Sequence, residues 1–165
     1  MLAALALVLS ASLSAPPDPP QDGQGVSPVP LVAAQAAVPG TTGEPDRLLR
    51  DGEAVVSAAA RFAVEAGVPL ADARLVLYDG QEALVEAEGA AEIGSASSRF
   101  TLAPTAALRP GSRYVLRLEG SQGRDVHDLS GRAFRPLSFP LRVAGEPSRE
   151  EPPRRAKGKK GKRRA

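Results

Sequence analysis

Three short segments in which apolar and polar side chains alternate limit the possible folds of this chain more than any other feature. They are residues 100–103, 114–119 and 138–143. Because successive side chains of a β-strand point to opposite faces, Tyr114, Leu116 and Leu118 should share one apolar face. Arg117 and Glu119 should then lie on the opposite face, which contacts water. The pattern is typical of antiparallel sheets with one buried face, and it predicts an all-β domain.

The aromatic residues indicate where the core of this domain lies. All six fall between residues 62 and 139, while segments rich in proline and glycine flank them. We therefore divide the chain into a signal peptide at residues 1–15, a Pro/Gly-rich linker at 16–50, a folded domain at 51–145 and a Lys/Arg-rich tail at 146–165. The linker and the tail are expected to be disordered.

The N-terminal segment has the composition of a secretory signal peptide. An unbroken apolar run from Leu2 to Leu9 is followed by small residues and then by prolines, although no Lys or Arg precedes the run. The run is too short to span a bilayer, so the mature chain is expected to lack a transmembrane span. We expect a secreted, periplasmic or cell-surface protein; the alternative is a disordered, alanine-rich N-terminus.

Eight prolines between residues 16 and 45 favour an extended spacer. Residues 29–38 are more apolar and are compatible with an edge strand, but Pro30 and Pro39 argue against a central one.

Residues 47–66 are compatible with two structures. Val55, Ala59 and Phe62 fall at helical spacing, and Gly67 would end such a helix. Alternation through Val56, Phe62 and other small residues favours a strand instead, with residues 67–72 as the turn into a second strand at 73–78. We favour the strand, and we expect residues 83–87 to form the strand that returns from the turn at Asp79 and Gly80.

Several motifs resemble the bacterial Ig-like domain of the S-layer SbsA type. They lie at residues 62–70 (FAVEAGVPL), 101–104 (TLAP), 108–111 (LRPG), 114–118 (YVLRL) and 128–131 (DLSG), with Phe139 in the closing strand. The resemblance covers residues 55–143 and implies an Ig-like antiparallel β-sandwich. The chain departs from the family at Arg132, where asparagine is usual, and at Pro136 and Pro140; Pro140 would suit an edge or a bulge.

The same motifs have physical reasons of their own. Pro110 and Gly111 favour a tight turn with positive φ at the glycine. The Tyr114 hydroxyl is then in a position to hydrogen bond to backbone near the preceding corner, as in the tyrosine corner of Ig-like domains. Asp128 is suited to cap the turn that follows it.

Residue types that carry catalysis gather only at 124–130. His127, Asp128 and Ser130 are too close together in a predicted loop to converge as a Ser-His-Asp relay, and a polar turn is the simpler interpretation. Calcium binding through Asp125 and Asp128 is the minority alternative. Glu82, Glu86, Glu88 and Glu92 are expected to form a solvated face. The chain has no cysteine, so thiol chemistry and disulfides are excluded; we predict no enzyme activity, no cofactor and no metal.

The basic tail is the one feature with distinct chemistry. Residues 154–165 contain eight Lys/Arg and no acidic residue, whereas the rest of the chain has 19 acidic against 13 basic residues. Such a segment attracts polyanions, namely anionic lipid, polysaccharide or nucleic acid, although it has no aromatic residue for base stacking. The predicted polyanion-binding residues are Arg154, Arg155, Lys157, Lys159, Lys160, Lys162, Arg163 and Arg164.

Two functions follow from the sequence. The first is an exported, non-enzymatic Ig-like module with a structural, adhesive or protein-interaction role at the bacterial cell envelope. The alternative is a polyanion-binding protein that acts through its tail.

Overall fold

The computed structural model describes residues 26–145, which form an all-β structure of twelve strands and one 3-10 turn. The elements are β1 (Ser27–Pro28), β2 (Leu31–Ala37), β3 (Asp46–Arg47), β4 (Ala54–Val56), β5 (Arg61–Ala66), β6 (Arg74–Asp79), β7 (Ala87–Ile93), β8 (Ser98–Pro104), β9 (Arg113–Glu119), η1 (Ser121–Gly123), β10 (Val126–His127), β11 (Ala133–Arg135) and β12 (Leu137–Val143). The predicted signal peptide and the basic tail lie outside the described residues.

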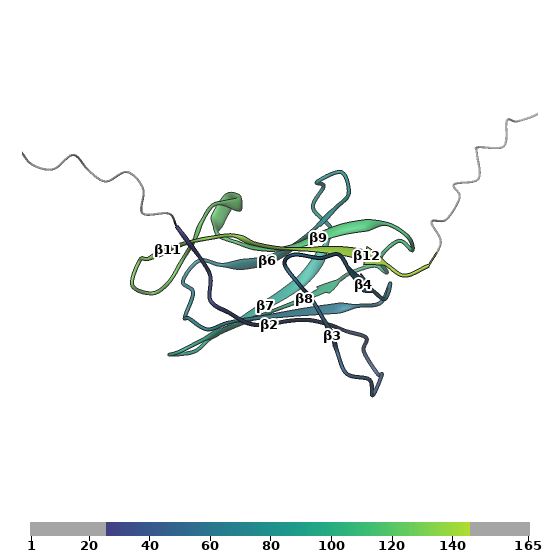
Figure 1. Ribbon diagram of the computed structural model, residues 1–165, viewed down its shortest axis with the longest axis horizontal. Helices are drawn as coiled ribbons and strands as arrows, with labels where there is room; N and C mark the ends of the chain where they lie inside the picture. The colour runs from purple at the N-terminus through teal and green to yellow at the C-terminus, as the bar shows by residue number, and fades with distance from the viewer. Residues whose placement is uncertain (1–25, 146–165) are drawn as a thin grey trace, which may run out of the picture.

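Two sheets face each other and enclose the core (Figure 1). One has the strand order β4-β12-β9-β6, and the other has the order β3-β2-β5-β8-β7. A third, small sheet of order β1-β11-β10 lies at one end. Neighbouring strands are antiparallel except for β4 with β12 and β1 with β11, which are parallel.

The core forms where the apolar faces of the two large sheets meet. Leu116 of β9 and Phe139 of β12 are opposite each other in one sheet, and Val64 of β5 and Phe100 of β8 are opposite each other in the other. All four side chains are almost fully buried. The predicted strands at residues 100–103, 114–119 and 138–143 are thereby confirmed as parts of β8, β9 and β12.

The predicted faces are confirmed with one exception. Tyr114, Leu116 and Leu118 are buried, while Arg117 is partly exposed on the outer side of the sheet. The prediction was wrong for Glu119, which was assigned to the water-facing side but is fully buried. Its burial comes from the turn η1, which lies over the outer side of the sheet (Figure 1).

The strand interpretation of residues 47–66 is confirmed. Two strands, β4 and β5, take the place of the possible helix, and a turn closed by the N–H of Ala60 donating to the C=O of Ser57 separates them. The second strand predicted at 73–78 is β6. Alanine-rich composition favours a helix locally, but burial of Phe62 and Val64 on one face of β5 favours the strand.

The strand-bearing region begins earlier than the predicted boundary at residue 51. From Ser27 onwards, the segment assigned to the linker contains β1, β2 and β3. Val29, Ala34, Ala36 and Leu48 of this segment are buried. Strand β2 lies next to the two-residue edge strand β3, so Pro30 and Pro39 flank a strand close to the sheet edge.

The return strand predicted at 83–87 is replaced by a single bridge between Tyr78 and Leu84. The full strand in this part of the chain is β7, which occupies the acidic, alanine-rich stretch that follows. Among the residues described, η1 is the one helical element.

The predicted turn chemistry is present. The N–H of Arg109 donates to the Tyr114 hydroxyl over 3.0 Å, as expected for a tyrosine corner. Gly111 has a φ of 71° in the turn after Pro110. Strand β4 pairs with β12 only from Leu141 onwards, so at Pro140 strand β12 pairs with β9 alone. One side of β12 is therefore without a strand neighbour at this residue, and the missing N–H of proline is accommodated there.

Replacing Leu116 with alanine should reduce the free energy of unfolding by about 2–5 kcal/mol, because it opens a cavity between the two sheets. Urea unfolding followed by circular dichroism measures the loss. Val55→Ala is the control, since Val55 is 61% exposed on β4 and its truncation should cost less than about 0.5 kcal/mol. Equal losses in the two variants would contradict the core described above.

Candidate functional site

The histidine at the 124–130 loop is paired with a residue far from that loop in sequence. The backbone N–H of His127 donates to Asp72 Oδ1 over 2.8 Å, and its ring Nδ1 lies 3.1 Å from Asp72 Oδ2. Burial would raise the pKa of Asp72, but these hydrogen bonds outweigh it and hold that pKa below its usual value. The Asp72–His127 pair fastens β10 to the loop before β6.

Asp128 and Ser130 form a closed turn rather than a relay with His127. The Ser130 hydroxyl donates to Asp128 Oδ1 over 2.6 Å, and the backbone N–H groups of Ser130 and Arg132 donate to the same oxygen over 2.9 Å. The Arg132 side chain binds Oδ2. Both carboxylate oxygens of Asp128 therefore accept hydrogen bonds from within this turn. No Ser-His-Asp arrangement occurs among residues 26–145.

Groups that would hold a metal ion are likewise absent from the part of the chain that the structure describes. Asp125 and Asp128, the calcium alternative, form no such group there. The side chains of Glu82, Glu86, Glu88 and Glu92 are exposed, as the prediction of a solvated face requires.

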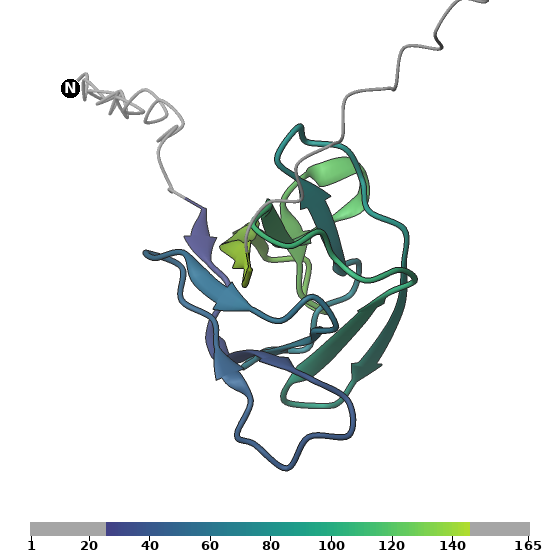
Figure 2. The same ribbon diagram turned by 90° about the vertical axis from the view of Figure 1, so that its right-hand side faces the viewer.

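Strand β7 is unusual because it is exposed on both faces and has one neighbour. Six of its seven residues are exposed, and β8 is the only strand with which it pairs. In Figure 2 it lies at the outer border of the molecule. The other end of this sheet, β3, is only two residues long. Long open edges are the usual templates for pairing with another chain.

The hydrogen bonds at the two ends of the β7–β8 pair show which residues of β7 bond to β8. The N–H of Thr105 donates to the C=O of Glu86 at one end, and the N–H of Gly94 donates to the C=O of Ser97 at the other. Hydrogen-bonded and non-bonded pairs alternate along an antiparallel ladder. With the observed register, even-numbered residues of β7 therefore bond to β8. The backbone groups directed to the open edge belong to Ala87, Gly89, Ala91 and Ile93.

Small side chains leave a hollow on the sheet surface beside this edge. Ala63 of β5, Ala90 of β7 and Ala103 of β8 are among the residues that line it, and its volume is about 590 Å³. Glu88 and Glu92 lie on the same face of β7 as Ala90. Arg99 of β8 lies opposite Glu92, whereas Ala103 lies opposite Glu88, so Glu88 has no basic cross-strand partner. We call the open backbone of β7 together with this hollow the β7 edge.

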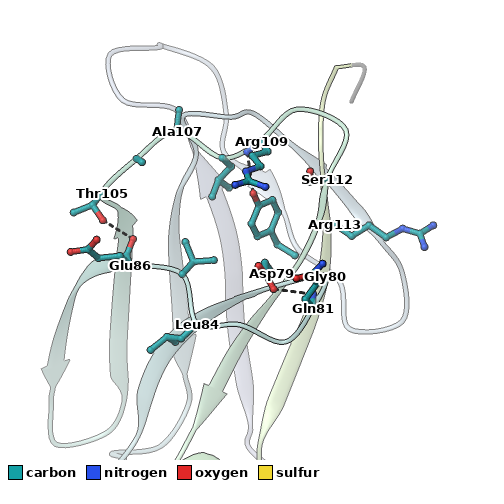
Figure 3. Close-up of a pocket in the computed structure, with 14 residues that line it drawn as sticks. Asp79, Gly80, Gln81, Leu84, Glu86, Thr105, Ala107, Arg109, Ser112 and Arg113 are labelled. Carbon is teal, nitrogen blue, oxygen red and sulfur yellow. Dashed lines mark hydrogen bonds between the residues drawn. The ribbon is translucent and has the colours of Figure 1, made fainter. Parts of the chain in front are cut away.

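A second hollow, of about 660 Å³, lies where β7 begins (Figure 3). The loop after β6 forms one wall, held by Asp79 Oδ1, which accepts the N–H groups of Gln81 and Ala83 over 2.9 Å. The loop between β8 and β9 forms the other wall. The Thr105 hydroxyl joins the walls by donating to the C=O of Glu86 over 2.7 Å. Leu84, 64% exposed, lies at the rim. We call this hollow the end pocket.

Comparison with known proteins gave no match to a protein-family model, to a curated protein or to a solved structure. Residues 26–145 contain no helix long and apolar enough to cross a membrane.

Sequence reasoning did not find the β7 edge, because a strand exposed on both faces has no apolar alternation. The available signal was a stretch without proline in which Glu88 and Glu92 alternate with small residues on one face. The eight predicted polyanion-binding residues lie outside the described part of the chain.

The turn at Asp128 generates a prediction about pH. The side-chain hydrogen bond from Ser130, helped by the backbone N–H groups and by Arg132, holds the pKa of Asp128 below its ordinary value. Its stabilising effect is therefore present above the unfolded pKa of about 3.9 and is lost as pH falls through the folded pKa. Asp128→Asn should be less stable than wild type at neutral pH, and the difference should shrink below about pH 4.

Thermal unfolding of both proteins between pH 7 and pH 3 checks this. Ser130→Ala keeps the carboxylate but removes its shortest hydrogen bond, so it should show a smaller pH dependence than wild type. A constant difference between Asp128→Asn and wild type across this pH range would contradict the assignment.

Proposed function

We propose that this protein is an exported, non-enzymatic Ig-like module of the bacterial cell envelope that binds an extended segment of another protein along the β7 edge. The observation that carries the proposal is the open backbone of β7, with four residues directing their hydrogen-bonding groups outward. An added strand would satisfy those groups, and main-chain hydrogen bonds of this kind give affinity with little dependence on side chains.

Charge indicates what the bound segment contains. Glu88 and Glu92 line the outer face of β7, so lysine or arginine at alternate positions of the partner would lie opposite them. A second copy of β7 is disfavoured, because it would bring two acidic strands together. The partner is therefore a basic, extended segment of another protein, with small or apolar residues on its other face.

The all-β architecture supports the Ig-like assignment through its two facing sheets and its tyrosine corner at Tyr114. The apolar N-terminal run and the absence of cysteine are compatible with an exported domain held together by packing alone. The support for a binding role is the open backbone of β7, which pairs with β8 alone.

A defined peptide tests the β7 edge. A nine-residue peptide that alternates lysine with valine should slow amide hydrogen exchange at Ala87, Gly89, Ala91 and Ile93. The amides of Glu88, Ala90 and Glu92 already bond to β8 and should change little. The matched peptide alternating glutamate with valine should bind at least about tenfold more weakly, since it places like charges opposite β7. NMR-detected exchange measures all seven amides separately.

Proline variants provide the control for this experiment. Ala91→Pro removes an outward N–H without removing a bond to β8, so it should fold and lose peptide binding. Ala90→Pro removes a ladder bond and should destabilise the hairpin. If the lysine peptide gave no alternating protection, or if Ala91→Pro bound it as well as wild type, strand addition at β7 would be rejected.

The composition of residues 154–165 favours the second candidate function, binding to anionic surfaces. Removing these residues should abolish retention on vesicles containing phosphatidylglycerol at low salt, and wild-type retention should fall steeply as salt is added. Vesicle co-sedimentation measures this, with neutral phosphatidylcholine vesicles as the control. Unchanged retention after truncation would remove this candidate.

A further inference from the structure

Glu119 is a fully buried carboxylate on the outer side of the four-stranded sheet. It lies opposite Arg74 in the β6–β9 register. Its Oε1 accepts hydrogen bonds from Arg74 Nη2 over 2.9 Å and from the Tyr78 hydroxyl over 3.0 Å. Burial raises the pKa of Tyr78, and the hydrogen bond to Glu119 adds to this, so the hydroxyl remains a donor at neutral pH. One oxygen of the carboxylate is therefore well satisfied.

The other oxygen, Oε2, has no hydrogen-bond partner and is closed off from solvent. The Nη1 atom of Arg117 lies 4.0 Å from Oε2, beyond hydrogen-bond distance. The Arg117 guanidinium instead lies over the Tyr78 ring, 5.2 Å from its centroid. A buried carboxyl oxygen without a hydrogen-bond partner is costly, and native structures rarely retain one without a reason.

The turn that covers Glu119 is fixed by a glycine. A Cβ on Gly120 would collide with the backbone C=O of Asp125, so the chain can reverse there only without a side chain. The reversal brings Gly123 over the carboxylate, where an added Cβ would lie 3.6 Å from Oε2. A side chain at Gly120 would therefore force the backbone of this turn to shift.

A cavity of about 380 Å³ adjoins this carboxylate. The polar residues that line it are Arg74, Tyr78, Asp79, Glu82, Arg117 and Glu119. The side chains of Arg74 and Arg117 are 51% and 38% exposed, so guanidinium donors remain free for a ligand. We call this cavity the Glu119 site.

The spacing of Oε2 and Arg117 selects one kind of ligand group. A hydroxyl oxygen about 2.8 Å from each would bridge the 4.0 Å gap, donating to Oε2 and accepting from Arg117. An ammonium group has no acceptor and would be repelled by the guanidinium. The free donors of Arg74 and Arg117 match a carboxylate, which planar guanidinium groups bind in bidentate fashion.

We propose that the Glu119 site binds a hydroxy acid, with its hydroxyl between Glu119 and Arg117 and its carboxylate on the two arginines. Because Oε2 is closed off in the structure, the ligand hydroxyl reaches it only through a small local rearrangement, after which Oε2 and the Arg117 guanidinium hold the hydroxyl between them. The carboxylates of Asp79 and Glu82, which also line the cavity, would accept further hydroxyls, so a sugar acid fits better than a short hydroxy acid. Such a ligand exists free or as a unit of an acidic polysaccharide. The proposal does not depend on the β7 edge.

Four small probes test the chemistry of the ligand. Lactate carries both groups, propionate lacks the hydroxyl, 1,2-propanediol lacks the carboxylate, and glucuronate adds the sugar ring. NMR titration of the full chain should rank glucuronate first and lactate second. Propionate and propanediol should bind about tenfold or more weakly than lactate, because each loses a hydrogen bond to a charged group. An oligoglucuronate that binds more tightly than glucuronate would identify polysaccharide as the source; equal affinity per unit would identify the free acid.

Variants assign the binding to this cavity. Arg117→Met keeps the side-chain stem and should reduce lactate affinity to that of propionate. Glu119→Gln presents an amide nitrogen or a less basic oxygen to the hydroxyl and should do the same. Arg142→Met changes an exposed arginine on the same face of the sheet, outside the cavity, and should bind like wild type. Tyr78 resonances should shift on binding, and those of Tyr114 should not.

Folding of each variant is checked by its amide spectrum. If Glu119→Gln unfolds, Arg117→Met decides, since Arg117 is partly exposed. Absence of saturable binding by glucuronate and lactate would overturn the proposal and leave Glu119 as a structural group. Equal affinity for lactate and propionate, or unchanged lactate binding in Arg117→Met, would overturn it as well.

Discussion

The structure depends on contact between the apolar faces of two sheets. Leu116 and Phe139 from one sheet and Val64 and Phe100 from the other bury their side chains there. Without cysteine, no disulfide supplements this contact. Burial of such side chains contributes roughly 1.5–3 kcal/mol each, which is comparable to a large part of the net stability of a small domain. The turns, the open edge and the cavity beside Glu119 all keep their geometry because these faces stay together.

The parts of the fold that follow from local patterns could be predicted from sequence. Strands β8, β9 and β12 each bury one face, so the alternation of their residues shows both the strand and its orientation. The tyrosine corner at Tyr114 and the turn at Asp128 depend on residues within a few positions of each other, and spacing alone was sufficient. Residues 29–38 were judged compatible with an edge strand, but they were assigned to the linker because of the prolines around them. In the structure, Pro30 and Pro39 flank β2 and do not interrupt it.

The remaining features arise from contacts that local patterns do not contain. The Asp72–His127 pair joins residues 55 positions apart, so no motif reveals it. Strand β7 has water on both faces and therefore no alternation. Glu119 was assigned to solvent because side chains alternate along β9, and its position in that alternation falls on the outer face. Its burial comes from the chain reversal at Gly120. Only glycine fits at this position, because a Cβ would clash with the backbone of Asp125, and the sequence does not show that these two residues are in contact.

The two parallel strand pairs have a consequence for the order in which the chain can fold. Strand β4 joins its sheet only by pairing residues 54–56 with residues 141–143 of β12, and β1 joins only by pairing with β11. Both β4 and β1 therefore lack hydrogen-bonding neighbours until residues near the C-terminal end of the domain are available, whereas β6 pairs with β9. Contacts so distant along the chain carry a high loop-closure cost and slow the search for the native state. During synthesis, β6 and β9 can therefore pair once Glu119 has been made, whereas β4 stays without a partner strand until Val143 has been made.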